Sequence, residues 1–496
     1  MKKYTLTSLL LLAAMLTASC GESTDTNTPV ADTAADTAAI VTEAITEAVP
    51  TEMDEHPLPD ADMNGMPFRF LNYDPVTLTW ALIDQVVDEE TGESINDEIF
   101  RRNSRISEKY NVVFEETVNE DVPSIYRKTL MSGEDLYEIG MPYDSYTATL
   151  YSDGLIRSWD CLPHVDLERS WWDQNANHIF NIGGKQFAAV GDFYLGMLTR
   201  GFVIVFNKEL LASADLNVNL YDMVRNSTWT LDKYIEIAKQ FPRDLNGDGQ
   251  WDEGDQYGTA GAIKLHFGSL AIGCGAKYFS YDKDGNPYFS VGEDAHTINV
   301  FEKIYELHDG TNIYFQHYKN TFHSGSNESR DMFLEGRTIF QGTSTKGIEY
   351  YRDSDFDIGI LPYPKFDEKQ EEYHILPSEC GVATIPVTIP EERLANVSII
   401  LEALSRDGQQ NLIPTYKEVV LKSKYSRDED SAEMLDIIFK SSTYDLGMSI
   451  WPEQTHFKYM TDFQNWKNNF VSTTEKIEKV IGKQVDILLD AISENT

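Results

Sequence analysis

Residues 244–255 have the residue types and the spacing of a calcium-binding loop. Oxygen-bearing side chains stand at loop positions 1, 3, 5, 9 and 12, and a glycine stands at position 6, where such a loop turns sharply. A hard cation needs six or more oxygens around it, and this spacing turns alternate side chains toward one centre. We therefore predict a structural Ca²⁺ with these ligands: Asp244, Asn246, Asp248, the Gln250 backbone carbonyl, Asp252 and Asp255.

The loop departs from the usual pattern at its last ligand. Asp255 replaces the longer glutamate that binds calcium through both oxygens, a variant also found in dockerin-like loops. The alternative is a surface turn rich in Asp and Gly that binds no metal. We expect a structural role for the ion, because it would fix the exit of a helix predicted over 230–241.

The first 20 residues have the pattern of an export signal. Lys2 and Lys3 precede an apolar run over 6–16, and small residues at 18 and 19 precede Cys20. This pattern resembles a bacterial lipobox, although Thr17 stands where an aliphatic residue is usual. It predicts a signal peptide over 1–19, acylation of Cys20 and lipid anchoring at the outer face of the cell membrane. The alternatives are a plain secretory signal and a retained anchor, for which the apolar run is too short to span a bilayer comfortably.

The composition separates an acidic leader from a globular body. The chain has 496 residues with a net charge of −40, which repels nucleic acid and anionic lipid. Residues 20–62 are rich in Thr, Ala, Asp and Glu and contain no Lys, Arg or aromatic residue. Such a segment cannot bury enough surface to offset its ordering entropy, so we predict a disordered tether.

Residues 68–141 alternate between strand and helix patterns. A strand ending at Tyr73, a helix over 95–110, a strand over 111–115, a helix over 125–131 and a strand over 135–141 follow one another. This order is typical of an α/β protein with a parallel sheet and crossover helices. Further strands are predicted at 186–190 and 202–206, and further helices at 296–308, 391–404, 431–439 and 474–489.

Several short motifs occur along the chain in an order that is typical of one protein family. The motifs are Thr91-Gly92-Glu93-Ser94-Ile95-Asn96-Asp97, Ser170-Trp171-Trp172-Asp173-Gln174, Gly183-Gly184-Lys185-Gln186-Phe187, Gly191-Asp192, Phe206-Asn207-Lys208-Glu209-Leu210-Leu211, Ser227-Thr228-Trp229-Thr230-Leu231-Asp232, Tyr257-Gly258, Gly336-Arg337-Thr338-Ile339-Phe340 and Ile360-Leu361-Pro362-Tyr363-Pro364-Lys365. With these motifs, the chain resembles the substrate-binding lipoproteins of bacterial carbohydrate ABC transporters from about residue 64 to its end.

The resemblance implies a two-lobed periplasmic-binding-protein fold of type II, with the ligand cleft between lobes that are discontinuous in sequence. The expected divisions are 63–195 for the first part of lobe I, 196–350 for the first part of lobe II, 351–390 for the return to lobe I, and 391–496 for the helical end of lobe II. It also implies a sugar or oligosaccharide ligand and ABC permease subunits as partners.

A sugar needs carboxylates and amides around its hydroxyls and flat aromatic rings on its faces. In open sheets, ligands lie beyond the carboxyl ends of strands. We therefore expect ligand-binding side chains after the strands, at the crossover after 191 and at two large aromatics. These are Tyr73, Asp74, Tyr143, Asp144, Trp172, Asp192, Tyr194 and Trp451, although core packing is the alternative for each ring.

Three functions fit these features. A binding protein that performs no catalysis is the first, because the chain has no nucleophile elbow, no metalloprotease helix and no Walker loop. A secreted glycan-active enzyme needs only two carboxylates at a suitable distance, and the chain has 81 acidic residues. A sugar-sensing lipoprotein that signals to a membrane kinase would share the cleft of a transport protein.

Overall fold

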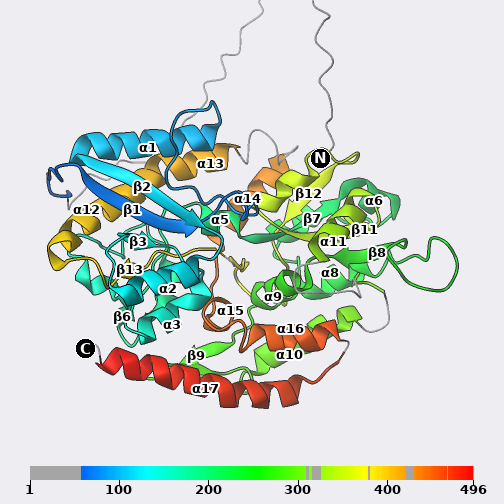
Figure 1. Ribbon diagram of the computed structural model, residues 1–496. Helices are drawn as coiled ribbons and strands as arrows, with labels where there is room; N and C mark the ends of the chain where they lie inside the picture. The colour runs from blue at the N-terminus through cyan, green and yellow to red at the C-terminus, as the bar shows by residue number, and fades with distance from the viewer. Residues whose placement is uncertain are drawn as a thin grey trace, which may run out of the picture. The chain divides into compact units, whose positions relative to one another are not determined.

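Two separate sheets organise the folded part of the chain (Figure 1). The computed structural model describes residues 57–308, 312–315, 325–377, 380–419, 429–465 and 467–494. The compact unit begins at Leu58, so residues 58–62, expected in the tether, belong to the folded body. The predicted signal peptide, Cys20 and the rest of the tether lie outside the described residues. None of the described helices is both long and apolar enough to cross a bilayer.

The first lobe contains a parallel sheet in the order β2-β1-β3. Its strands are β1 (Met66–Tyr73), β2 (Val112–Asn119) and β3 (Ile139–Gly140), joined by helices α1 (Ser94–Tyr110) and α2 (Val122–Ser132). This is the predicted strand–helix alternation. The third strand is shorter than predicted.

Local chemistry fixes the ends of α1. The Glu93 carboxylate accepts hydrogen bonds from the backbone N–H groups of Ile95 and Asn96, which satisfies two donors at the start of the helix. Asn111 ends the helix in the left-handed conformation, at φ 53°. Buried residues recur at three- and four-residue spacing between these ends, so one face of α1 packs on the lobe.

The second lobe contains a mixed sheet in the order β12-β7-β11-β8. Strand β7 (Phe202–Asn207) is buried at every position and pairs antiparallel with β11 (Thr338–Ser344) and β12 (Ile358–Leu361). Strand β8 (Tyr257–Ala260) runs parallel to β11. The near-continuous apolar run of β7 is what a central strand covered on both faces requires. Figure 1 shows helices α8 (Leu231–Ala238), α9 (Ile263–Gly273) and α11 (Gly325–Leu334) around this sheet.

The remaining elements are short or lie outside the two sheets. They are η1 (Asp144–Tyr146), α3 (Thr147–Ser152), β4 (Ile156–Arg157), η2 (Trp159–Cys161), α4 (Gln174–Phe180), β5 (Asn181–Ile182), β6 (Lys185–Gln186), α5 (Gly196–Thr199), α6 (Lys208–Ser213), α7 (Leu220–Arg225), β9 (Phe279–Tyr281), β10 (Pro287–Phe289), α10 (Ala295–Tyr305), η3 (Glu306–His308), η4 (Lys346–Tyr351), β13 (Ile385–Pro386), α12 (Glu391–Asp407), the π-helix η5 (Gly408–Leu412), α13 (Ile413–Val419), α14 (Glu429–Lys440), α15 (Leu446–Ser449), α16 (His456–Gln464) and α17 (Phe470–Glu494).

The chain first passes between the sheets over residues 191–202, directly before β7. Its return differs from the expected division at 351–390, because β12 pairs with β7 in the second sheet. The return comes after Pro377, where Ala383 pairs with Ala189 and Thr384 pairs with Gly140. The chain therefore remains in the second lobe about 25 residues longer than the motif order suggested.

Helix α12 also departs from the expected division, which placed 391–496 in the second lobe. It packs on α1 of the first lobe, beside which Figure 1 draws it. The π-helix η5 and α13 continue from it and also contact α1, and α14 then packs on β12 of the second sheet. The long helix α17 contacts α3 in the first lobe and β10 in the second. Both lobes thus contain C-terminal segments.

Candidate functional site

The ends of β1 and β3 bring two pairs of predicted ligand-binding residues close together. Tyr73 ends β1 and Tyr143 follows β3, and their rings stack with centroids 4.3 Å apart and an interplanar angle of 20°. The Tyr143 N–H donates to Tyr73 Oη over 3.1 Å. Asp144 begins η1 and is buried. Asp74 is partly exposed, and its Oδ1 accepts from the Val76 N–H at 2.8 Å, so it shapes the turn after β1.

Tyr194 joins this group from the passage between the lobes. Its hydroxyl lies 3.0 Å from Cys380 Sγ, and both residues are buried. Burial raises the pKa of the Cys380 thiol to about 11, so the thiol stays protonated and is a poor nucleophile. Burial also raises the pKa of Tyr194 well above its usual value, with smaller contributions from Cys380, Tyr143 and Tyr73. We call Tyr73, Tyr143, Asp144, Tyr194 and Cys380 the tyrosine cluster.

Asp192 lies beside a second buried carboxylate. Burial raises the pKa of Asp192 to about 7; the positive charge of Lys417 opposes this rise and the negative charge of Asp173 adds to it. Asp173 caps α4 and accepts a 3.0 Å hydrogen bond from the Tyr444 hydroxyl. The passage after Gly191 therefore carries a carboxyl group that titrates near neutral pH.

The two predicted tryptophans belong to the core. Trp172 is only 1% exposed, and its indole N–H donates to Glu402 over 3.0 Å. Trp451 is 5% exposed and stacks on Phe279 with centroids 5.2 Å apart. Neither ring presents a free face to a ligand. Both rings pack in the core, which was the alternative to ligand binding.

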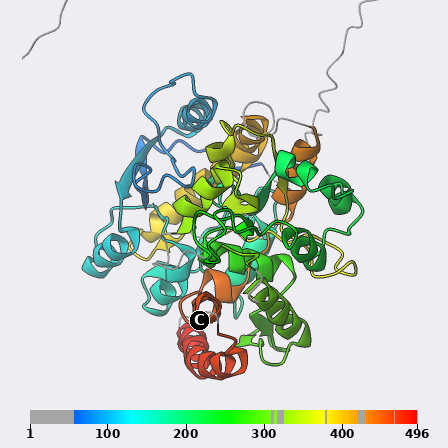
Figure 2. The ribbon, with the colours of Figure 1, turned by 90° about the vertical axis from the view of Figure 1, so that its right-hand side faces the viewer.

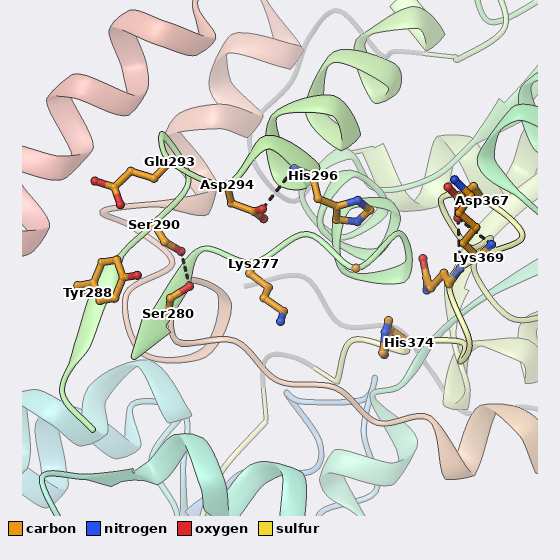
Figure 3. Close-up of a pocket in the computed structure, with 12 residues that line it drawn as sticks. Lys277, Ser280, Tyr288, Ser290, Glu293, Asp294, His296, Asp367, Lys369 and His374 are labelled. Carbon is orange, nitrogen blue, oxygen red and sulfur yellow. Dashed lines mark hydrogen bonds between the residues drawn. The ribbon is translucent and has the colours of Figure 1, made fainter. Parts of the chain in front are cut away.

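A pocket of about 800 Å³ lies in the second lobe, and none of the eight predicted ligand residues lines it (Figure 3). It is formed by the segment after α9, the β9–β10 hairpin, the start of α10 and the loop over 366–374. The lining residues are Gly275, Lys277, Ser280, Tyr288, Ser290, Glu293, Asp294, His296, Asp367, Lys369, Gln370 and His374.

The pocket offers the chemistry of a polar ligand site. Tyr288 is 42% exposed and presents an aromatic ring, and Ser280 Oγ donates to Ser290 Oγ at 2.9 Å. Gln370 is held in place, because its amide donates to the Gly273 and Glu372 carbonyls at 2.8 Å. A ring, hydroxyls and charged groups around a concave space are what a sugar-sized ligand requires.

The pocket adjoins the passage between the lobes. His374 Nδ1 lies 3.0 Å from Thr443 Oγ1, and the next residue, Tyr444, donates to Asp173 at the start of α4. Asn175 Nδ2 donates to the Ser442 carbonyl at 2.7 Å. Residues 442–444 therefore connect the second-lobe pocket to the polar groups of the first lobe.

Sequence reasoning missed the pocket because its residues carry no motif. The turn Asp282-Lys283-Asp284-Gly285-Asn286 between Tyr281 and Pro287 is a signal for a hairpin, and the Asp282 carboxylate accepts the N–H groups of Asp284 and Asn286. That signal would have found the strands that present Ser280 and Tyr288. The hairpin signal would not have shown that these strands lie opposite the loop over 366–374.

The predicted calcium loop adopts the turn that its spacing requires. Gly249 has φ 78°, and the Asp244 carboxylate accepts the N–H groups of Gly247 and Gly249 at 2.7 and 2.8 Å. Asp255 is fully buried and accepts from Leu245 and Asp252, both at 3.0 Å. The carboxylates thus turn into the loop. Within the described ranges, no three His, Cys, Asp or Glu side chains converge as a ready metal site.

Several solved structures with a similar fold are sugar-binding proteins. A cyclic α-maltosyl-1,6-maltose binding protein from Arthrobacter globiformis matches with a TM-score of 0.57 at 11% identity, over 85% of this chain and 99% of that one. The maltose/maltodextrin-binding domain MalE from Bdellovibrio bacteriovorus, bound to maltotriose, matches with a TM-score of 0.52 at 12% identity, over 85% and 100%. An ABC substrate-binding protein from Listeria monocytogenes, in complex with cycloalternan, matches with a TM-score of 0.50 at 11% identity, over 86% and 99%.

No protein-family model matches the sequence, and no curated protein matches it by sequence. The structural matches nevertheless cover most of the chain and nearly all of each neighbour. The predicted α/β fold of periplasmic binding proteins is therefore confirmed.

Asp192 makes the stability of the fold depend on pH. Because its folded pKa of about 7 lies above its ordinary value of 3.8, the folded protein holds a proton that the unfolded chain releases. Stability from this group is present below pH 4 and is lost as the pH rises to about 7. Asp192→Asn should therefore lose less stability than the wild type between pH 5 and pH 8, measured as the urea midpoint. Equal losses in the two proteins would contradict this assignment.

Proposed function

We propose that the protein captures a carbohydrate outside the cell and delivers it to the permease subunits of an ABC importer. The observation that carries this proposal is the structural match of most of the chain to proteins that bind sugars. Function is thereby inferred from shared fold, which by itself leaves the ligand open. The pocket beside Tyr288 adds independent support from the chemistry of its lining.

The pocket suits binding without reaction. Its volume of about 800 Å³ lies within the usual range for small-molecule sites, about 300–1,000 Å³. Asp294 and Asp367 are engaged as caps of backbone N–H groups, in the first turn of α10 and in the loop over 366–374. Burial opposes ionisation of Asp294, but the hydrogen bonds from Thr297 and His296 outweigh it and lower the pKa of this carboxyl, so Asp294 is a poor general acid. This supports a binding protein over a glycoside hydrolase, which needs one protonated carboxyl.

We expect Tyr288→Ala to weaken binding of the sugar ligand by about 1–3 kcal/mol, because it removes the exposed ring of the pocket. Isothermal titration calorimetry on ligands found with a glycan array would measure this. Tyr350→Ala is the matched control, because Tyr350 is 43% exposed but does not line the pocket.

Release of new reducing ends from the bound glycan would favour the secreted-enzyme alternative and contradict a purely binding role. Crosslinking in cells separates transport from sensing. Capture of permease subunits supports the importer, whereas capture of a membrane kinase with no permease would favour the sensor.

We further propose that the loop over 244–255 binds Ca²⁺. The fit rests on the fully buried Asp255 and on the inward-turned Asp244 at opposite ends of the loop. Each carboxylate oxygen keeps a lone pair beyond the one that a backbone N–H uses, so the donors can serve a cation as well. The ion would hold the exit of α8 against β8, a structural role.

Calcium should therefore raise the melting temperature of the wild-type protein, by the equivalent of about 2.7 kcal/mol at a hundredfold excess over Kd. Asp248→Ala should abolish this shift, because it removes one ligand. Asp284→Ala should keep it, because Asp284 is an equally exposed aspartate in a different turn. A melting curve that chelator and calcium leave unchanged would rule out the site.

Anchoring through Cys20 is also a proposal, carried by the lipobox-like sequence. Cys20→Ala should remove the protein from the membrane fraction or stop its maturation, because the acylated side chain is lost. Fractionation followed by mass determination would check this. If the variant remains in membranes at its mature size, another feature anchors the chain.

A further inference from the structure

The second-lobe pocket concentrates basic side chains in an acidic protein. The chain carries 41 lysines and arginines, 10 histidines and 81 acids, yet four of the twelve lining residues are lysine or histidine. They are Lys277, His296, Lys369 and His374. They come from three separate segments, so the fold and not a sequence run brings them together.

Lys277 is the central cation of this group. It makes no ion pair with any residue of the described ranges, although many surface lysines do, such as Lys283 with Asp284 at 2.8 Å. Figure 3 shows its side chain extending toward the open space between it and His374. The charge of Lys277 reaches His374: burial lowers the pKa of that imidazole, Glu372 opposes the shift, and Lys277 adds to it.

No ion pair joins Lys277 to the acids of the pocket within the described ranges, although its charge acts on the buried Asp445, which accepts the N–H groups of Tyr278 and Phe279. Asp294 accepts the N–H groups of His296 and Thr297 and the Thr297 hydroxyl, at 3.2, 3.1 and 2.5 Å. Asp367 accepts the N–H groups of Lys369 and Gln370 at 2.9 and 3.2 Å. Glu293 is exposed, and Figure 3 shows it pointing away from Lys277.

We propose that this pocket binds a sugar of the uronic acid class, with the ligand carboxylate held by the Lys277 ammonium and the sugar ring against Tyr288. This inference rests on the proposed sugar-binding function and adds that the ligand is negatively charged. The net charge of −40 does not prevent it, because fields from charges beyond about 8 Å are largely screened at physiological ionic strength. A charge-assisted hydrogen bond then decides the local preference.

The test compares acidic and neutral glycans on the full-length protein. A glycan array that contains both classes identifies ligands, and calorimetry then measures the best acidic ligand and its methyl ester, which has the same shape without the charge. We expect the acid to bind about tenfold or more tightly than the ester. Lys277→Met should remove that advantage and leave binding of the ester unchanged.

Lys283→Met is the matched control, because Lys283 lies in the turn of the hairpin that follows Lys277 but outside the pocket. It should bind both ligands as the wild type does, and the melting temperatures of both variants check that they fold. Binding of neutral or amino sugars only, or an equal loss for acid and ester in Lys277→Met, would overturn the uronate inference and leave the sugar-binding function standing. If no glycan of any class binds, both fall.

Discussion

Backbone pairing at the passages between the two sheets is the constraint on which the rest of the molecule depends. The Phe202 N–H donates to the Leu376 carbonyl at 3.2 Å, and the Thr345 N–H donates to the Gly201 carbonyl at 2.8 Å. Buried backbone groups must find partners, so segments distant in sequence are held together at this point. Residues 194 and 380 continue from these segments, and the tyrosine cluster takes its position from them.

Packing decides which aromatic rings remain available to a ligand. A large ring stabilises the fold most when it is buried, and Trp172 and Trp451 follow that rule. Strand β10 shows how a ring stays outside: its residues alternate sides, so Phe289 packs on Phe279 while Tyr288 between Pro287 and Phe289 faces the pocket. The hairpin thus exposes a ring that an isolated loop would not hold in place.

Charge acts at two ranges in this protein. The excess of acids sets the sign of the electrostatic field far from the surface. Close to the pocket, Asp294 and Asp367 accept hydrogen bonds from backbone N–H groups, whereas Lys277 makes no ion pair within the described ranges. The lining still holds three carboxylates against two lysines, so the preference proposed for the pocket depends on where Lys277 lies and not on the net local charge. Buried carboxyls such as Asp192 and Glu402, each with a pKa raised by burial to about 7, give the body a further dependence on pH.

The sequence by itself determined the local elements and the class of fold. Caps and periodic apolar positions fixed α1, and the order of strands and helices before residue 141 predicted the parallel sheet, because these signals act over a few residues. Strand ends also brought Tyr73 and Tyr143 to one place, as the edge of a parallel sheet requires. The glycine spacing of the loop over 244–255 likewise predicted its turn.

Only the tertiary structure decided the rest. Strand β12 joins the second sheet and α12 packs on α1 through contacts between segments far apart in the chain. Such contacts leave no local pattern in the sequence. The burial of Trp172 depended on Glu402, 230 residues away, which accepts its indole N–H. The pocket required Lys277, Tyr288 and His374 to meet from three segments, and no spacing along the chain encodes that meeting. The sequence specifies the residue types, but the packing of the whole folded body determines which of them line the same pocket.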